Sequence, residues 1–120
     1  MIASWPFYSR DEIDAVSNVL SSGLVNKWFG EITNAFEKEF AEYFNLKNAL
    51  TTANGTLSLE AAYSAIDFKD GQELITTPRS FIATASSAVL KGAKVRFADV
   101  DINSGNITSN SIEPLINSNT

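Results

Sequence analysis

Residues 48–66, NALTTANGTLSLEAAYSAI, decide the fold class of this chain. The short apolar run from Ala49 to Thr52 predicts a β-strand, Asn54-Gly55 predicts a turn, and the small residues from Thr56 to Ile66 predict a helix. A strand that passes through a tight turn into a helix is the repeating step of α/β proteins. We therefore expect more such steps along the chain.

The sequence after this stretch continues the alternation. It predicts, in order, a turn at Asp70-Gly71, a strand over 73–77 closed by Pro78, a helix capped by Ser80 that runs to about Leu90 and ends at Lys91-Gly92, a strand over 94–98, and a short helix over 111–117 capped by Ser109 or Asn110. Strands that alternate with helices of this length pair in parallel through right-handed crossovers. The expected fold is α/β, with a mostly parallel sheet and flanking helices.

The first part of the chain predicts two helices, within about residues 9–44, ahead of an α/β part over about residues 48–117. Ser9 and Glu12 have the spacing of a capping box, and Gly23 ends the first helix. Apolar residues of this helix fall on one face: Ile13, Val16, Val19 and Leu20. The second helix runs from about Glu31 to Phe44, and its aromatic stripe is expected to pack in the core: Phe36, Phe40, Tyr43 and Phe44.

Composition narrows the possible chemistry. The chain has 9 Lys and Arg against 14 Asp and Glu, a formal net charge of −5, which gives no reason to expect binding to nucleic acid or to an acidic membrane surface. It contains no Cys and no His, so disulfides, the usual metal sites and His or Cys catalysis are excluded. The N-terminus has neither a signal-peptide pattern nor a membrane-spanning apolar run, so a cytoplasmic location is expected.

The predicted sheet looks unfinished. Only three strands are predicted, and the alternation would next supply a strand after the last helix. Parallel sheets usually have several strands and helices over both faces. Residues 1–120 are therefore expected to be a portion of a longer protein.

The loop Asn54-Gly55-Thr56 is the first candidate site, because a strand feeds a helix there. Free N–H groups and the positive end of the helix dipole point outward at such a junction, and Gly55 allows a ligand to approach the backbone. This arrangement suits a phosphate group. The alternative is an ordinary turn and helix cap.

A second candidate site follows the next strand. The loop that contains Arg79, Phe81 and Thr84 should lie at the same sheet edge, since ligands of open α/β sheets bind at the carboxyl ends of the strands. Phe81 could stack on a planar ring or simply cover the sheet. Asp99 and Asp101 alternate along a strand end, so they are better explained as solvated turn acids than as a metal site, and no metal is expected.

Taken together, these segments resemble the DegT/DnrJ/EryC/StrS family of sugar aminotransferases that depend on pyridoxal 5'-phosphate (PLP). Nearly the whole chain carries the resemblance: Trp5-Pro6, residues 11–16 and 19–23, Gly30 with residues 36–43, residues 53–59, residues 71–75 with Pro78, Phe81, Ala83 and Thr84, then Gly92-Ala93, Phe97, residues 99–101 and residues 106–107. The resemblance implies a type I (aspartate aminotransferase-like) fold whose large domain begins in residues 1–120. It also implies active sites at the interface of a homodimer.

The resemblance further implies roles for individual residues. Gly55 and Thr56 would hold the cofactor phosphate, Phe81 would stack on the pyridine ring, and Asn54 and Thr84 would complete the cofactor-binding set. Asn54 stands where the family usually has Ser. Arg79 receives no role.

The implied activity is transfer of an amino group, typically from glutamate, to a nucleotide-linked keto-sugar in lipopolysaccharide, other surface polysaccharide or glycoside biosynthesis. In this family the lysine that binds the cofactor covalently and the aspartate on the pyridine nitrogen lie further along, beyond Thr120. The isolated chain is therefore expected to be inactive, to have no catalytic residue of its own, and to bind PLP weakly or not at all. Two alternatives stay open: a PLP- or PMP-dependent sugar dehydratase of the same fold, and a non-enzymatic phosphate-binding module.

Overall fold

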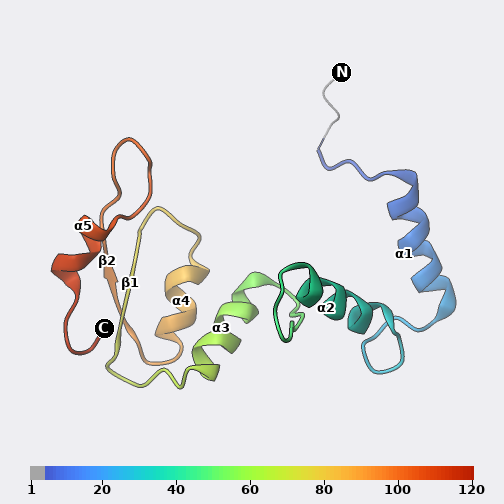
Figure 1. The fold of residues 1–120 in the computed structure, drawn as a ribbon, viewed down its shortest axis with the longest axis horizontal. Coiled ribbons are helices and arrows are strands. Elements are labelled where there is room, and N and C mark those ends of the chain that lie inside the picture. The colour runs from blue at the N-terminus through green and yellow to red at the C-terminus, as the bar shows by residue number, and fades with distance from the viewer. Residues whose placement is uncertain (1–4) are drawn as a thin grey trace. The chain divides into compact units, whose positions relative to one another are not determined.

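A computed structural model describes residues 5–120, which fall into two compact units, one up to Thr51 and the other from Thr52 to Thr120 (Figure 1). No helix within residues 5–120 is long and apolar enough to cross a lipid bilayer. The order of elements, two helices followed by alternating helices and strands, confirms the expected α/β fold class.

The first helix of the N-terminal unit, α1 (Arg10–Ser22), has the predicted ends. The backbone N–H of Ser9 donates to the Glu12 carboxylate at 2.7 Å, and Gly23 ends the helix with a left-handed φ of 71°. Its apolar face, however, is uncovered: Ile13 and Val16 are 47% and 61% exposed. The capping prediction is confirmed, whereas no element of the described first unit buries this face.

The second helix, α2 (Ile32–Tyr43), carries the aromatic stripe as a chain of rings in mutual contact. The centroids of Phe36 and Phe40 lie 5.9 Å apart, and those of Phe40 and Phe44 lie 4.6 Å apart. The predicted burial of the stripe is wrong for this chain, because these rings remain exposed and Ala41 is the buried residue of α2. The rings pack along the helix rather than beneath a second layer.

The predicted strand at Ala49–Thr52 does not form. A strand needs a neighbour that accepts its backbone N–H groups, but here the Glu37 carboxylate takes the Thr51 N–H at 2.8 Å and the Thr51 hydroxyl at 2.7 Å. The ammonium group of Lys27 also reaches this carboxylate, at 2.5 Å. A side chain of α2 therefore anchors the segment where a ladder was expected.

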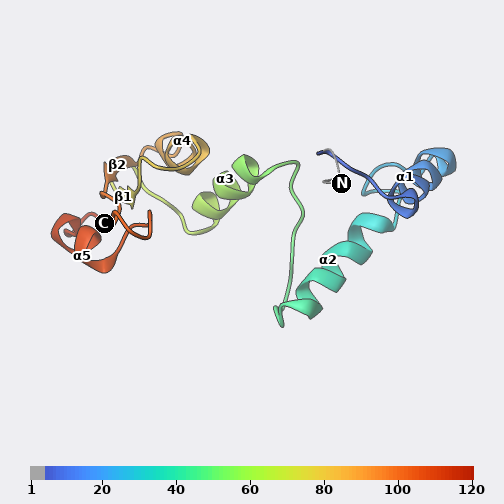
Figure 2. The same cartoon turned by 90° about the horizontal axis from the view of Figure 1, so that it is seen from above.

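The second unit consists of α3 (Gly55–Ala65), β1 (Glu73–Thr76), α4 (Ala83–Val89), β2 (Lys94–Phe97), α5 (Ser109–Ile112) and the 3₁₀ helix η1 (Glu113–Leu115). The two strands pair in parallel, with Glu73 opposite Lys94 and Thr76 opposite Phe97. The parallel sheet is confirmed with two strands instead of the predicted three. Figure 2 shows α4 beside both α3 and the strands, in agreement with the contacts between these elements.

Small residues allow this close packing. The buried side chains of the second unit are Thr76, Ala83, Ser87, Ala88, Ala93 and Ala98. Ser87 is fully buried, and its hydroxyl lies 3.5 Å from the Thr56 carbonyl. Helix α4 therefore packs closely against the first turn of α3.

Two helix starts differ from the prediction. Ile82, not Ser80, stands at the N-cap of α4, while the Ser80 hydroxyl bonds to the Thr84 hydroxyl at 2.9 Å. Thr108, not Ser109 or Asn110, caps α5, because its hydroxyl accepts the Ser111 N–H at 3.3 Å. Before α5, hydroxyl and amide side chains stand in a row over residues 108–111, and local sequence alone does not select among them.

Candidate functional site

The carboxyl edge of the sheet collects the loops that carry the predicted site. Because β1 and β2 are parallel, the loop from β1 into α4 and the loop from β2 into α5 both leave from this edge. The N-terminus of α3 faces the same way, as Figure 1 shows, because α3 runs antiparallel to β1 before the short connection between them. This edge is where open α/β sheets bind their ligands.

The N-terminus of α3 is a capped helix start with unclaimed donors. The Asn54 side-chain oxygen accepts the Leu57 N–H at 3.0 Å, and the Asn54 carbonyl accepts the Ser58 N–H at 3.1 Å. Within the described residues, the N–H groups of Gly55 and Thr56 have no acceptor. A helix start with free N–H groups at its positive end is a site for an anion.

The side of Gly55 on which a side chain would stand is open. A Cβ placed on Gly55 would meet no atom within 4 Å. The Thr52 side chain holds the backbone at the start of α3. Its hydroxyl donates to the Asn54 carbonyl at 2.9 Å and contacts the Ser58 hydroxyl at 2.5 Å. The Asn54 side chain forms the cap that was the alternative, while the N–H groups of Gly55 and Thr56 stay without an acceptor, so the anion site remains a prediction.

Phe81 and Thr84 lie in and just after the loop between β1 and α4. The Phe81 ring is 74% exposed, so it does not serve as a cover for the sheet. Thr84 is half-buried, with its hydroxyl on Ser80 and its N–H donating to the Phe81 carbonyl at 3.1 Å. Packing of α3 against α4 brings both predicted segments to one edge, but no recorded hydrogen bond joins Phe81 to Gly55 or Thr56.

The two acids after β2 act within their own turn. The Asp101 carboxylate accepts the Ser104 N–H at 2.8 Å and the Asn103 N–H at 3.1 Å, and the Ser104 N–H holds the pKa of Asp101 below its usual value. Asp99 accepts the Val100 N–H at 2.8 Å. The expectation of turn acids is confirmed, and residues 5–120 contain no cluster of three acidic side chains that could hold a metal ion.

Arg79 has a partner that the sequence did not indicate. Its Nη1 donates to the Gly105 carbonyl at 2.9 Å, which links the loop before α4 to the loop after β2. The signal available in the sequence was the turn-rich stretch around Gly105, but its partner stands 26 positions away.

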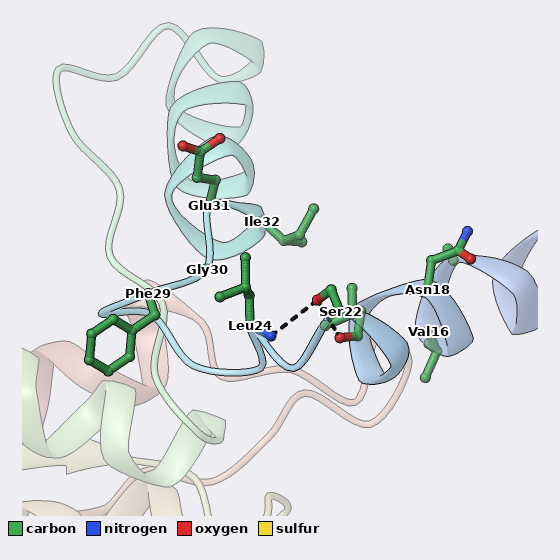
Figure 3. A pocket seen from close by; sticks show the side chains of 10 residues that line it. Val16, Asn18, Ser22, Leu24, Phe29, Gly30, Glu31 and Ile32 are labelled. Carbon is green, nitrogen blue, oxygen red and sulfur yellow. Dashed lines mark hydrogen bonds between the residues drawn. The ribbon is translucent and has the colours of Figure 1, made fainter.

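The N-terminal unit contains a separate apolar groove (Figure 3). It has a volume of about 650 Å³ and lies between the C-terminal half of α1 and the start of α2, with Val16, Leu24 and Ile32 along it. The Leu24 N–H donates to the hydroxyl of Ser22, another lining residue, at 3.1 Å. Apart from Glu31 the lining residues carry no ionisable group, so the groove offers apolar contact rather than acid–base chemistry.

Comparison with known proteins identifies relatives over nearly the whole chain. The model of the DegT/DnrJ/EryC1/StrS aminotransferase family matches residues 7–120. The spore coat polysaccharide biosynthesis protein SpsC of Bacillus subtilis is 35% identical over 94% of this chain and 28% of its own length. UDP-4-amino-4,6-dideoxy-N-acetyl-beta-L-altrosamine transaminase of Campylobacter jejuni is 35% identical over 87% of this chain and 27% of its own length. The chain thus spans less than a third of the length of these relatives.

Solved structures agree with the sequence relatives. The aminotransferase from Psychrobacter cryohalolentis superimposes with a TM-score of 0.93 and 47% identity, over 98% of this chain and 30% of that one. The GDP-4-keto-6-deoxy-D-mannose-3-dehydratase of E. coli, solved with bound hydrated PLP, matches with a TM-score of 0.83 and 28% identity, over 99% of this chain and 31% of that one. Aminotransferases and a dehydratase therefore share this segment's fold.

Proposed function

The chain belongs to the DegT/DnrJ/EryC1/StrS aminotransferase family, and on that premise we propose that it forms the N-terminal part of a PLP-dependent aminotransferase that acts on a nucleotide-linked keto-sugar. The sugar transaminase among its relatives and the fold shared with PLP enzymes support this proposal. Its contribution to such an enzyme would be the phosphate end and one wall of the cofactor site.

The observation that carries the proposal is the open start of α3. The N–H groups of Gly55 and Thr56 lack acceptors within the described residues, and the Cβ position of Gly55 faces open space. A phosphate group offers the several acceptor oxygens and the negative charge that such a start binds well. These residues therefore fit the phosphate of PLP.

Each of the proposed cofactor-binding residues has a distinct role. Gly55 and Thr56 bind the phosphate through their N–H groups and the Thr56 hydroxyl, while the exposed Phe81 ring covers one face of the pyridine. Thr84 supports this wall through the backbone of Phe81. Because the oxygen of Asn54 already caps α3, only its side-chain N–H group remains for the phosphate. The bound cofactor supplies the electron sink for amino transfer, and the protein supplies orientation.

The lysines of the second unit stand away from this site. Lys69 precedes β1, Lys91 follows α4 and Lys94 begins β2, which places all of them toward the amino edge of the sheet, opposite the loops of the site. In the first unit, Lys27 is paired with Glu37. We propose that the lysine and the aspartate that complete the site lie outside residues 1–120.

Two further points belong to the same proposal. The uncovered aromatic face of α2 and the apolar groove beside α1 support assembly as a homodimer. A sugar nucleotide and an amino donor such as glutamate imply a cytoplasmic enzyme.

The matching dehydratase structure keeps a PLP- or PMP-dependent sugar dehydratase as a second candidate, since both reactions would use the same phosphate loop. A phosphate-binding module without enzymatic activity is the third.

Titration of the full-length protein with PLP tests the phosphate site. Thr56→Ala removes a hydroxyl donor to a charged phosphate, and hydrogen bonds of this kind contribute about 1.5–3 kcal/mol, so the dissociation constant should rise at least about tenfold. Inorganic phosphate should compete with PLP in the wild type. Phe81→Leu should also weaken PLP binding, but not phosphate binding, because it removes only the stacking face.

The matched control is Thr33→Ala, which removes a half-buried hydroxyl from α2 in the other unit. If Thr56→Ala binds PLP as tightly as Thr33→Ala while remaining folded by circular dichroism, the phosphate assignment is wrong. Borohydride reduction followed by peptide mass spectrometry adds a second check. A stoichiometric PLP adduct on one lysine of this chain would contradict the placement of the covalent lysine elsewhere.

A further inference from the structure

Arg79 links the two loops at the carboxyl edge of the sheet. It lies in the loop between β1 and α4, two positions before Phe81, and its Nη1 donates to the Gly105 carbonyl in the loop between β2 and α5, at 2.9 Å. Within residues 5–120 no carboxylate lies within ion-pair distance of Arg79. The contact with Gly105 is therefore the interaction that orients this guanidinium.

The receiving loop is closed and shaped for this contact. The Gly105 N–H donates to the Asp101 carbonyl at 2.8 Å, and the Asp101 N–H donates to the Asn106 carbonyl at 2.9 Å. Gly105 has a left-handed φ of 67°, and a Cβ on it would overlap Nη1 of Arg79. The positive φ favours glycine here, and any larger residue would force the guanidinium to move away.

The donating loop is ordered around the same side chain. The Arg79 N–H donates to the Thr77 hydroxyl at 3.1 Å, directly after β1, and the Thr84 N–H donates to the Phe81 carbonyl at 3.1 Å, at the start of α4. The Phe81 side chain between these two points is exposed, and its backbone carbonyl is held by the Thr84 N–H. Restraint on this loop therefore comes from Thr77 at its start, from Ser80 and Phe81 bonded to Thr84 at its end, and from Arg79.

We propose that Arg79 is a positioning residue. By binding the Gly105 carbonyl it fixes the loop between β1 and α4 to the loop between β2 and α5, and so holds the backbone of Phe81 at the carboxyl edge. The link between the loops stands on geometry alone. Its importance for a cofactor rests on the proposed function, in which Phe81 covers the pyridine ring.

Amide hydrogen exchange of the 120-residue chain, followed by NMR, tests the link without any ligand. Arg79→Gln should accelerate exchange of the Gly105 N–H and the Thr84 N–H by about tenfold, because loss of a bond from a charged donor allows local opening. Arg79→Lys should restore part of the protection, since an ammonium group can still donate to the carbonyl. Lys91→Gln, which removes one positive charge from the same unit, is the matched control.

A substitution in the opposite loop makes the test specific. Gly105→Ala should also accelerate exchange at Thr84, because the new methyl group displaces the Arg79 side chain. Gly71→Ala controls for backbone strain: Gly71 has a φ of 82°, but its Cβ position is free of neighbours. If Thr84 keeps its wild-type protection in both Arg79→Gln and Gly105→Ala, the proposal is overturned.

Titration of the full-length protein with PLP distinguishes a positioning role of Arg79 from an effect on stability alone. Arg79→Gln should bind PLP about threefold more weakly than Lys91→Gln at an equal melting temperature. Faster exchange at Thr84 with unchanged PLP affinity would overturn the positioning role. A full-length wild-type protein that binds no PLP would count against the proposed function, while the exchange data from this chain would still decide whether Arg79 holds the loop of Phe81.

Discussion

Glu37 joins two other segments of the first unit through its carboxylate. Its carboxylate receives the Lys27 ammonium at 2.5 Å and both the N–H and the hydroxyl of Thr51, at 2.8 and 2.7 Å. The hydrogen bond from Lys27, followed by those from Thr51, lowers the pKa of Glu37 to about 2. One half-buried side chain thereby fixes the loop before α2 and the segment that leads to α3.

Glu37→Gln should destabilise the chain at neutral pH, because the amide keeps the shape but loses the charge that pairs with Lys27. We expect the melting temperature at pH 7 to fall by about 5 °C. Since the folded pKa lies below the usual 4.5, the carboxylate stabilises the fold above about pH 4.5 and loses this effect as the pH falls toward about 2. The difference between variant and wild type should therefore shrink over this range.

Thermal melts followed by circular dichroism at pH 7, 4.5 and 2.5 measure this difference. Glu39→Gln, on an exposed position of the same helix, is the control and should change the melting temperature little at any pH. A gap between Glu37→Gln and wild type that stays constant down to pH 2.5 would contradict the assigned role of the carboxylate.

At the scale of single residues, the sequence predicts contacts between residues that are close together in the chain. Asn54, Gly55 and Thr56 could be predicted to lie together because they form the start of one helix, although no strand precedes it. The contacts of Glu37 and Arg79 could not be foreseen, because their partners stand 14 and 26 positions away and depend on how the chain folds back.

Among the elements, α3 and α4 show how packing depends on residue size. Ala88 is fully buried in α4, and its neighbours Ala83 and Ser87 are also buried, which lets the helix lie close to both α3 and the strands. A side chain larger than alanine has no space to occupy at position 88. Protein interiors respond to such overpacking with shifted rotamers and backbone.

Ala88→Leu should therefore destabilise the second unit by about 1–3 kcal/mol. Urea denaturation followed by circular dichroism gives the free energy of unfolding. Val89→Leu adds bulk at the next position, which is 55% exposed, and should change stability by less than about 0.5 kcal/mol. Equal effects of the two substitutions would show that α4 does not pack as described.

Sequence patterns are sufficient to predict some helices and strands of this chain but not others. The start of α1 at Ser9 and Glu12 and its end at Gly23 follow from local capping, and the helix forms within these ends. The strand predicted at residues 49–52 is absent, because an apolar run specifies a strand only when a neighbour completes the ladder. Two parallel strands did form, since the crossover through α4 brings them together.

For the whole molecule, the sequence predicts the fold class and the family, because many short segments occur in the right order over residues 7–120. It does not predict burial. The aromatic stripe of α2 and the apolar face of α1 have core-like spacing but remain exposed. Periodicity shows which residues share a face, whereas burial depends on whether another layer covers that face.

The small-residue core has a calorimetric consequence. The heat capacity change of unfolding is set mainly by newly exposed apolar area, about 12–15 cal/mol/K per residue in ordinary globular proteins, or about 1.4–1.8 kcal/mol/K for a chain of this length. Here the buried side chains of the described residues are Ala, Ser and Thr, and most large apolar side chains are already exposed when folded. Scanning calorimetry at several pH values should give a clearly smaller value, and one within the ordinary range would contradict this account. The stability curve of the chain should therefore be unusually flat, with cold denaturation displaced to lower temperature.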